Sequence, residues 1–83
     1  MRKDEIWALE SKQVLSFFRK QSDVTETKTG FRFAACQITV TALPPKGEGF
    51  WRRPQTRVEM EGPDGDVDAV YRRFFLQFLS AGG

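Results

Sequence analysis

The 83-residue chain has room for one small domain, and we expect residues 1–83 to form a single α+β unit. Its composition, 40% hydrophobic and 13% aromatic, is typical of a folded domain rather than a disordered segment. The chain has no histidine and only one cysteine, Cys36, which excludes histidine-based acid–base catalysis and an intrachain disulfide. We therefore expect a protein that is not an enzyme and that holds no metal and no cofactor.

The small size and the charge pattern also set expectations for partners and location. Small domains without disulfides or metals often depend on oligomerisation for stability. Acidic residues follow the basic N-terminal Met1–Lys3 segment where a signal peptide would need apolar residues, and no apolar run approaches the length of a membrane span. The sequence thus predicts a cytoplasmic protein that makes no membrane contact.

Residues 4–21 show helical periodicity. Trp7, Val14 and Phe18 fall on one face at helical spacing, with Ser11 among them. The pattern predicts a helix over residues 11–19. Residues 4–8 either belong to the same helix, with Asp4 at its start, or precede a shorter helix that Ser11 caps.

Three strands are predicted in the middle of the chain. Residues 24–29 are β-branched and polar, which favours a short edge strand, and residues 31–43 alternate as a long strand. The alternation changes parity at residues 34–36, which indicates a bulge, or else a strand buried on both faces near Phe31 and Phe33. We expect Pro44 and Pro45 to end this strand.

The third strand and a final helix complete the predicted order. Residues 50–61 alternate again, and Pro54 indicates an edge strand or a bulge because proline cannot donate a ladder hydrogen bond. A helix from about residue 66 to residue 80 follows an acidic stretch that complements the helix dipole. The expected fold is a two-layer α-β-β-β-α sandwich, with a three-stranded antiparallel meander and both helices on one face.

The last helix is apolar over more of its circumference than a core stripe requires. Its inner stripe is formed by Val67, Val70, Tyr71, Phe74 and Phe78. Beyond that stripe, Phe75, Leu76 and Leu79 extend the apolar surface most of the way round the helix. Either the sheet and first helix cover these side chains, or they form a partner surface. We favour the second reading, in which the protein is an interaction domain that forms a homodimer through this helix.

An alternative function rests on an arginine cluster. Arg52, Arg53 and Arg57 lie near Trp51, and this combination suits phosphate binding and base stacking. The sequence therefore allows a nucleic-acid-binding accessory protein. Residues 59–68 carry five acids and no base, however, and would repel a phosphate backbone nearby. For that reason we expect protein interaction rather than nucleic-acid binding.

Overall fold

The computed structural model describes residues 1–82, with side chains for residues 1–79. This part of the chain forms five strands and two α-helices, so the α+β class is confirmed and the predicted three-stranded sheet is wrong. The strands are β1 (Arg2–Trp7), β2 (Val24–Glu26), β3 (Phe31–Phe33), β4 (Cys36–Lys46) and β5 (Arg53–Glu61). The helices are α1 (Ser11–Arg19) and α2 (Asp64–Gly82), and a short 3-10 helix, η1 (Gly49–Trp51), joins β4 to β5.

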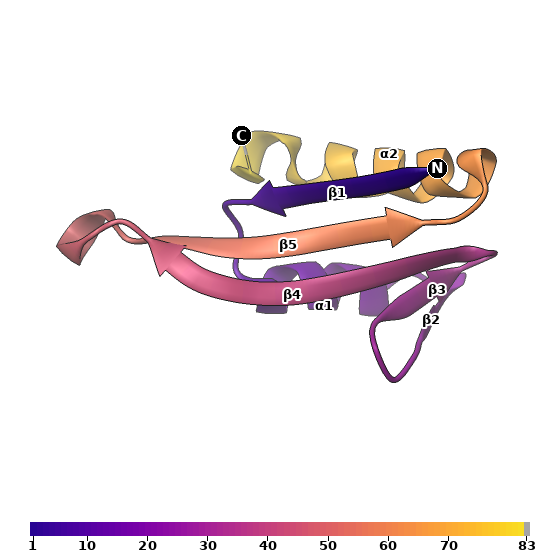
Figure 1. The fold of residues 1–83 in the computed structure, drawn as a ribbon, viewed down its shortest axis with the longest axis horizontal. Helices are drawn as coiled ribbons and strands as arrows, with labels where there is room; N and C mark the ends of the chain where they lie inside the picture. Colours follow the sequence, from indigo (N-terminus) through magenta and orange to yellow (C-terminus); the bar gives the residue numbers. More distant parts are fainter. Residues whose placement is uncertain (83) are drawn as a thin grey trace.

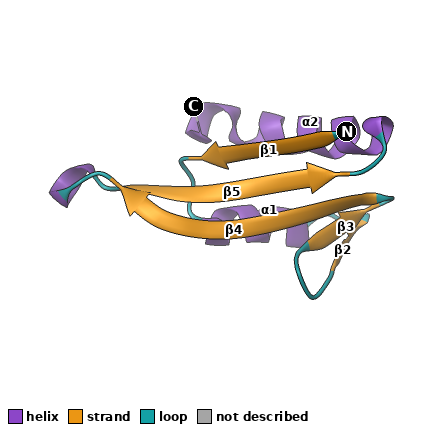
Figure 2. Ribbon diagram, viewed as in Figure 1, coloured by secondary structure: helices purple, strands orange, loops and turns teal. Residues whose placement is uncertain are grey.

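All neighbouring strands pair antiparallel, in the order β1-β5-β4-β3-β2. Strands β2 to β5 follow one another as a meander, and β1 completes the sheet by pairing with β5 (Figure 1). In Figures 1 and 2, α1 lies behind β4, and α2 runs along β1 and is partly covered by it. Helix α2 contacts β1 and β5, whereas α1 contacts β4 and β2.

The N-terminal segment is a strand. Of the two predicted alternatives, a helix that begins at Asp4 is wrong, and the shorter helix over residues 11–19 is confirmed, with Glu10 rather than Ser11 at its cap. Lys3, Glu5 and Trp7 lie opposite Met60, Val58 and Thr56 of β5, so they face the helices. The alternate residues of β1 face the other side of the sheet. This pairing satisfies the β1 backbone groups on the side of β5 and overrides the weak local preference of a charged sequence. Helix α1 starts at Ser11 with Glu10 at the cap position, where the Glu10 amide donates to the Gln13 side chain over 3.1 Å.

The parity change at residues 34–36 is a turn rather than a bulge. Phe33 pairs directly with Cys36, so β3 and β4 are two strands of a tight hairpin. Ala34 has a φ of 52°, in the left-handed region that a non-glycine residue enters mainly in turns. The predicted long strand is therefore two strands, β3 and β4, and each has its own alternation of buried and exposed residues.

Pro44 and Pro45 do not end the strand as predicted, whereas Pro54 lies opposite an irregularity of the β4–β5 ladder, in line with the predicted alternative of a bulge. Strand β4 continues through Pro44 and Pro45 to Lys46, with a register shift between Leu43 and Lys46. Strand β5 is not an edge strand, because it pairs with both β1 and β4. Pro54 lies beyond the stretch of β5 that pairs with β1, where no β1 carbonyl needs its missing N–H.

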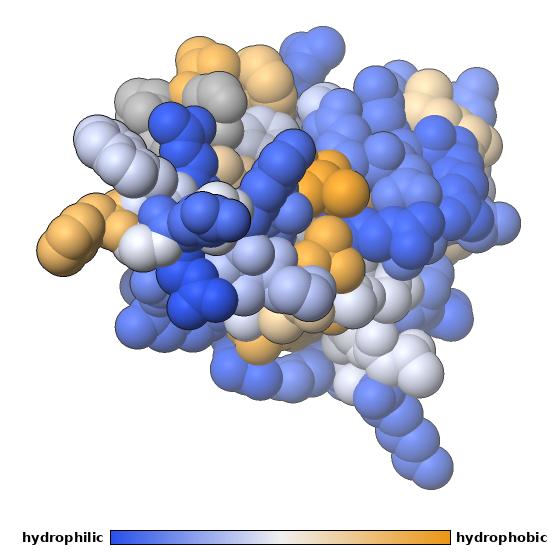
Figure 3. All heavy atoms as spheres, turned by 60° about the vertical axis from the view of Figure 1, so that its left-hand side comes forward, coloured by the Kyte–Doolittle hydropathy of each residue, from blue (hydrophilic) through white to orange (hydrophobic). Residues whose placement is uncertain are grey.

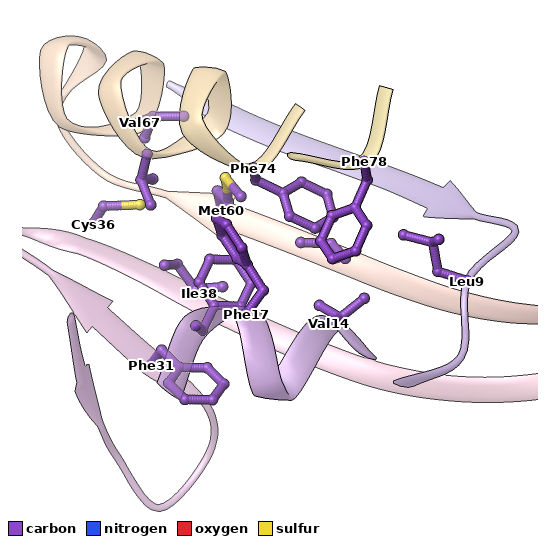
Figure 4. Close-up of a cluster of buried hydrophobic side chains, with 13 residues drawn as sticks. Leu9, Val14, Phe17, Phe31, Cys36, Ile38, Met60, Val67, Phe74 and Phe78 are labelled. Atoms are coloured by element: carbon purple, nitrogen blue, oxygen red, sulfur yellow. The ribbon is translucent and has the colours of Figure 1, made fainter. Parts of the chain in front are cut away.

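The core lies between the helices and one face of the sheet (Figure 4). Phe18 of α1 and Phe74 of α2 are both fully buried, and their rings stack. Thr56 is the buried polar residue of this region, and its hydroxyl donates to the Leu9 carbonyl over 2.7 Å. The sheet contributes the buried side chains of Phe31, Cys36, Ile38, Val58 and Met60.

Candidate interaction surfaces

Helix α2 divides its apolar side chains between the core and the surface. The predicted inner stripe is confirmed, with Tyr71 half-buried and the other members buried. Phe75, Leu76 and Leu79 are respectively 36%, 64% and 52% exposed. Sheet and first helix therefore leave them accessible. The structure brings all three together on the C-terminal half of α2, on the side away from the core.

Aromatic neighbours hold Phe75 in place. Its ring lies 5.9 Å from the Trp7 ring and 6.0 Å from the Tyr71 ring, measured between centroids. Glu5 fixes both neighbours, because its Oε1 accepts a hydrogen bond from the Tyr71 hydroxyl at 2.8 Å and one from Trp7 Nε1 at 3.2 Å. The base of the exposed patch on α2 is consequently rigid, which lowers the entropic cost of binding a partner.

The same contacts shift the acidity of Tyr71. Burial, followed by the hydrogen bond to the Glu5 carboxylate, raises the pKa of Tyr71 to about 12. The phenol therefore stays protonated at neutral pH and keeps donating to Glu5. The ammonium group of Lys3 lies 4.6 Å from the centre of the Tyr71 ring on the β1 side. Helix α2 and β1 are joined by this polar cluster beneath the apolar patch.

The free edge of β1 is the other surface near α2 that a partner could use. Its side chains are mostly charged, with Arg2 and Asp4 on one face and Lys3 and Glu5 on the other. Ile6, which is 57% exposed, is the apolar exception on the face of Arg2 and Asp4. Charged side chains at a sheet edge disfavour pairing with another strand. The exposed side chains of α2 are thus better suited to a protein partner than the adjacent strand edge.

The predicted arginine cluster is split in two. Trp51, Arg52 and Arg53 lie at the end of the β4–β5 hairpin, where Trp51 is 82% exposed and both arginines are exposed. Phe50, beside Trp51, is fully exposed as well. Sequence reasoning missed Phe50 as a site residue, although its place in a glycine-containing loop next to Trp51 was a usable signal.

Arg57 does not belong to the tip of the hairpin. It lies on the sheet face opposite the helices, where its Nη2 and Nε donate to the Asp4 carboxylate at 2.6 and 2.9 Å. Hydrogen bonding from Arg57 is the largest cause that lowers the pKa of Asp4 to about 2. Glu59 lies 3.6 Å from the Arg57 guanidinium. The Arg57 side chain is already occupied by carboxylates and is a poor phosphate ligand.

The rest of the described surface offers weaker sites. In Figure 3, which brings the left-hand side of Figure 1 forward, apolar atoms form several separate areas among hydrophilic ones. A groove of about 590 Å³ lies between the helices, but it is open, and Phe17 and Phe78 in its lining are core residues. Among residues 1–82, no three Cys, Asp or Glu side chains gather into a possible metal site.

Comparison with protein-family models, with curated proteins and with solved structures finds no match to this chain. Neither helix in the described residues combines the length and the apolar character needed to cross a membrane. By their exposure, two surfaces of the described residues are candidates for function: the exposed side chains of α2, and the tip of the β4–β5 hairpin.

Proposed function

We propose that this protein is a non-enzymatic interaction domain that forms a homodimer through α2. The observation that carries the proposal is the exposure of Phe75, Leu76 and Leu79 on a helix whose opposite side is core. Grouped apolar side chains at a surface are typical of binding sites, and a rigid aromatic residue at their centre is typical of an energetic hot spot. We also propose a cytoplasmic location, which suits the free thiol of Cys36.

A second copy of the chain is a suitable partner for the exposed side of α2, because this surface can be complementary to itself. In our proposal the sheet and the helices form two layers, which leaves the outer side of α2 free. Two antiparallel copies of α2 around a two-fold axis near Phe75 place Leu79 of one copy over Tyr71 and Arg72 of the other. The aliphatic part of Arg72 can cover apolar surface while its charged end stays in water. Asp68, one turn earlier, supplies a polar rim.

The test compares variants on the two sides of the same helix. Leu76→Glu and Leu79→Glu place a charge in the proposed interface, whereas Gln77→Glu places the same charge at an exposed position outside it. We expect the parent chain and Gln77→Glu to be dimers at micromolar concentration by light scattering. Leu76→Glu and Leu79→Glu should be monomers with an unchanged circular dichroism spectrum, because both side chains are exposed in the single chain.

Two results would contradict the proposal. A parent chain that is monomeric at high micromolar concentration has no homodimer to explain. A parent dimer that survives both leucine substitutions uses another surface, and α2 is then not the interface.

A further inference from the structure

The β4–β5 hairpin ends in two aromatic side chains that contact no other ring. Phe50 is fully exposed, Trp51 is 82% exposed, and neither takes part in the ring pairs found among the described residues. The tip lies at the far left of Figure 1, beyond the ends of β1 and α1. Two large rings are thus held in solvent at the end of an arm, which is the part of the β4–β5 hairpin that extends beyond the pairing with β1.

The backbone of the tip has a defined shape. The Trp51 amide donates to the Glu48 carbonyl over 3.0 Å and closes the turn η1. Gly47 has a φ of 109°, and a Cβ atom there would lie 2.3 Å from the Trp51 carbonyl oxygen. Only glycine fits this close approach. The turn therefore fixes the point at which the aromatic residues leave the hairpin.

Positive charge gathers beside the two rings. Lys46 lies directly opposite Arg53 in the ladder, and Arg52 precedes Arg53 in the chain. Like charges directly opposite one another destabilise a strand pair. None of the ion pairs seen in residues 1–82 involves these three cations, and Glu48 is the one acid between residues 46 and 53. An anionic partner would relieve this repulsion.

The acidic stretch that opposed nucleic-acid binding in the sequence lies at the other end of the arm. It begins at Glu59 in the last part of β5, a strand that runs away from the tip, and continues into the start of α2. At about 3.3 Å per residue, Glu61 is about 26 Å from Arg53 along the strand. Exposed charges are largely screened beyond about 8 Å at physiological salt, so these acids do not oppose phosphate binding at the tip.

We propose that the hairpin tip binds single-stranded nucleic acid. Phe50 and Trp51 stack on unpaired bases, while Lys46, Arg52 and Arg53 contact the phosphates. Single strands fit better than duplexes, because duplex bases already stack on each other and expose no face to a protruding ring. They also fit better than a membrane, because Glu48 would enter the headgroup region with the rings and two side chains give little apolar area for anchoring.

The first experiment measures base stacking. A labelled oligothymidylate of about 12 nucleotides, within the usual range of single-strand site sizes, is titrated with the protein by fluorescence anisotropy at physiological salt. We expect Trp51→Ala to weaken binding by about 5- to 150-fold, the loss associated with one stacked base. Trp51→Phe, which retains a ring, should keep most of the affinity. Quenching of tryptophan fluorescence on binding that is lost in Trp51→Phe supports the contact, because Trp7 gives the remaining signal.

The second experiment measures the phosphate contacts. Three neutralised phosphates give a slope of about −2 in a plot of log K against log salt for a single strand, and removing two of them leaves about −0.7. We expect this change for the double variant Arg52→Gln, Arg53→Gln. The matched control is Arg32→Gln, an exposed arginine on β3 outside the arm, which should leave the slope and affinity unchanged.

Several outcomes would overturn the proposal. Affinity for the oligonucleotide that does not depend on Trp51, or equal affinity for a duplex of the same length, would exclude base stacking at the tip. Binding to phosphatidylserine vesicles that is lost in Trp51→Ala, without oligonucleotide binding, would identify the tip as a membrane contact instead. Circular dichroism of each variant checks that the fold is intact.

Discussion

The Phe74 ring stacks on the Phe18 ring, with centroids 5.7 Å apart and planes inclined by 10°. The contact joins α2 to α1 directly above the sheet. Phe17 and Phe78 surround it, with ring centroids 5.9 and 5.1 Å from that of Phe74. Phe74 is consequently the aromatic centre of the core, whereas Phe75, the next residue, belongs to the exposed patch on α2.

The substitution Phe74→Ala should unfold the protein. Removing a buried phenylalanine ring costs about 3–5 kcal/mol, because transfer energy is lost and a cavity remains. That is comparable to the whole free energy of unfolding of a small domain, about 5 kcal/mol or more. We expect a chain with little helical circular dichroism signal at 25 °C, or one that aggregates.

Phe75→Ser is the matched comparison on the same helix. Phe75 is partly exposed and contacts Trp7 and Tyr71 rather than the centre of the core, so we expect a folded chain that no longer dimerises. Circular dichroism and solution mass together separate the two effects. If both variants unfold alike, Phe75 is a core residue and the proposed interface loses its central side chain.

Tyr71 should titrate about two pKa units above an ordinary tyrosine, at about 12 rather than 10. It is the single tyrosine of the chain, so the ultraviolet absorbance of phenolate reports on it alone. Because the pKa of Tyr71 is raised in the folded state, the contribution of the protonated Tyr71 to the stability of the fold is complete below about pH 10. It is lost as the pH rises through about 12. The folded protein should therefore become less stable over that interval.

The control for this titration is Glu5→Gln. The amide can still accept the hydrogen bond from Tyr71 but carries no negative charge, so the midpoint should fall while burial keeps it above 10. Titration in concentrated urea supplies the unfolded reference. A parent midpoint close to the urea value would contradict the contact between Tyr71 and Glu5.

Thr56→Val should destabilise the fold although the two side chains have nearly the same shape. The Thr56 hydroxyl is fully buried and donates to the Leu9 carbonyl, which leads from β1 into α1. Valine leaves that acceptor without its donor, at a cost of about 1–3 kcal/mol. Urea unfolding measures the change. Thr56→Ser, which keeps the hydroxyl, should lose less, and a valine variant at least as stable as the parent would show that the bond contributes nothing.

The helices could be predicted from the sequence because their apolar residues recur at helical spacing. That periodicity placed Val14 and Phe18 in the core and left Phe75, Leu76 and Leu79 outside it. The first strand could not be predicted in this way. Its inner face carries Lys3 and Glu5, whose place in the sheet depends on a partner strand far along the chain and on the Tyr71 ring above them.

The arginine cluster shows a second limit of the sequence. Residues 51–57 are close in the chain, but a strand advances about 3.3 Å per residue, so Arg57 is about 13 Å from Arg53. In the folded sheet, β1 lies beside β5, and Asp4 of β1 forms an ion pair with Arg57. The composition of residues 51–57 cannot predict an ion pair with a residue that is distant in the sequence. The exposure of Phe50 likewise depends on where the hairpin ends relative to the helices.

The pairing of β1 with β5 has a consequence for the order in which the fold assembles. Trp7 meets Thr56 and Arg2 meets Glu61, so β1 is synthesised about 50 residues before the strand with which it pairs. The β2–β3–β4–β5 meander has local connections and can form earlier, whereas contacts of high sequence separation form slowly. A folding intermediate would therefore expose the edge of β5 and hold β1 loose. Chaperone binding or misassembly during synthesis is expected to concentrate at that edge.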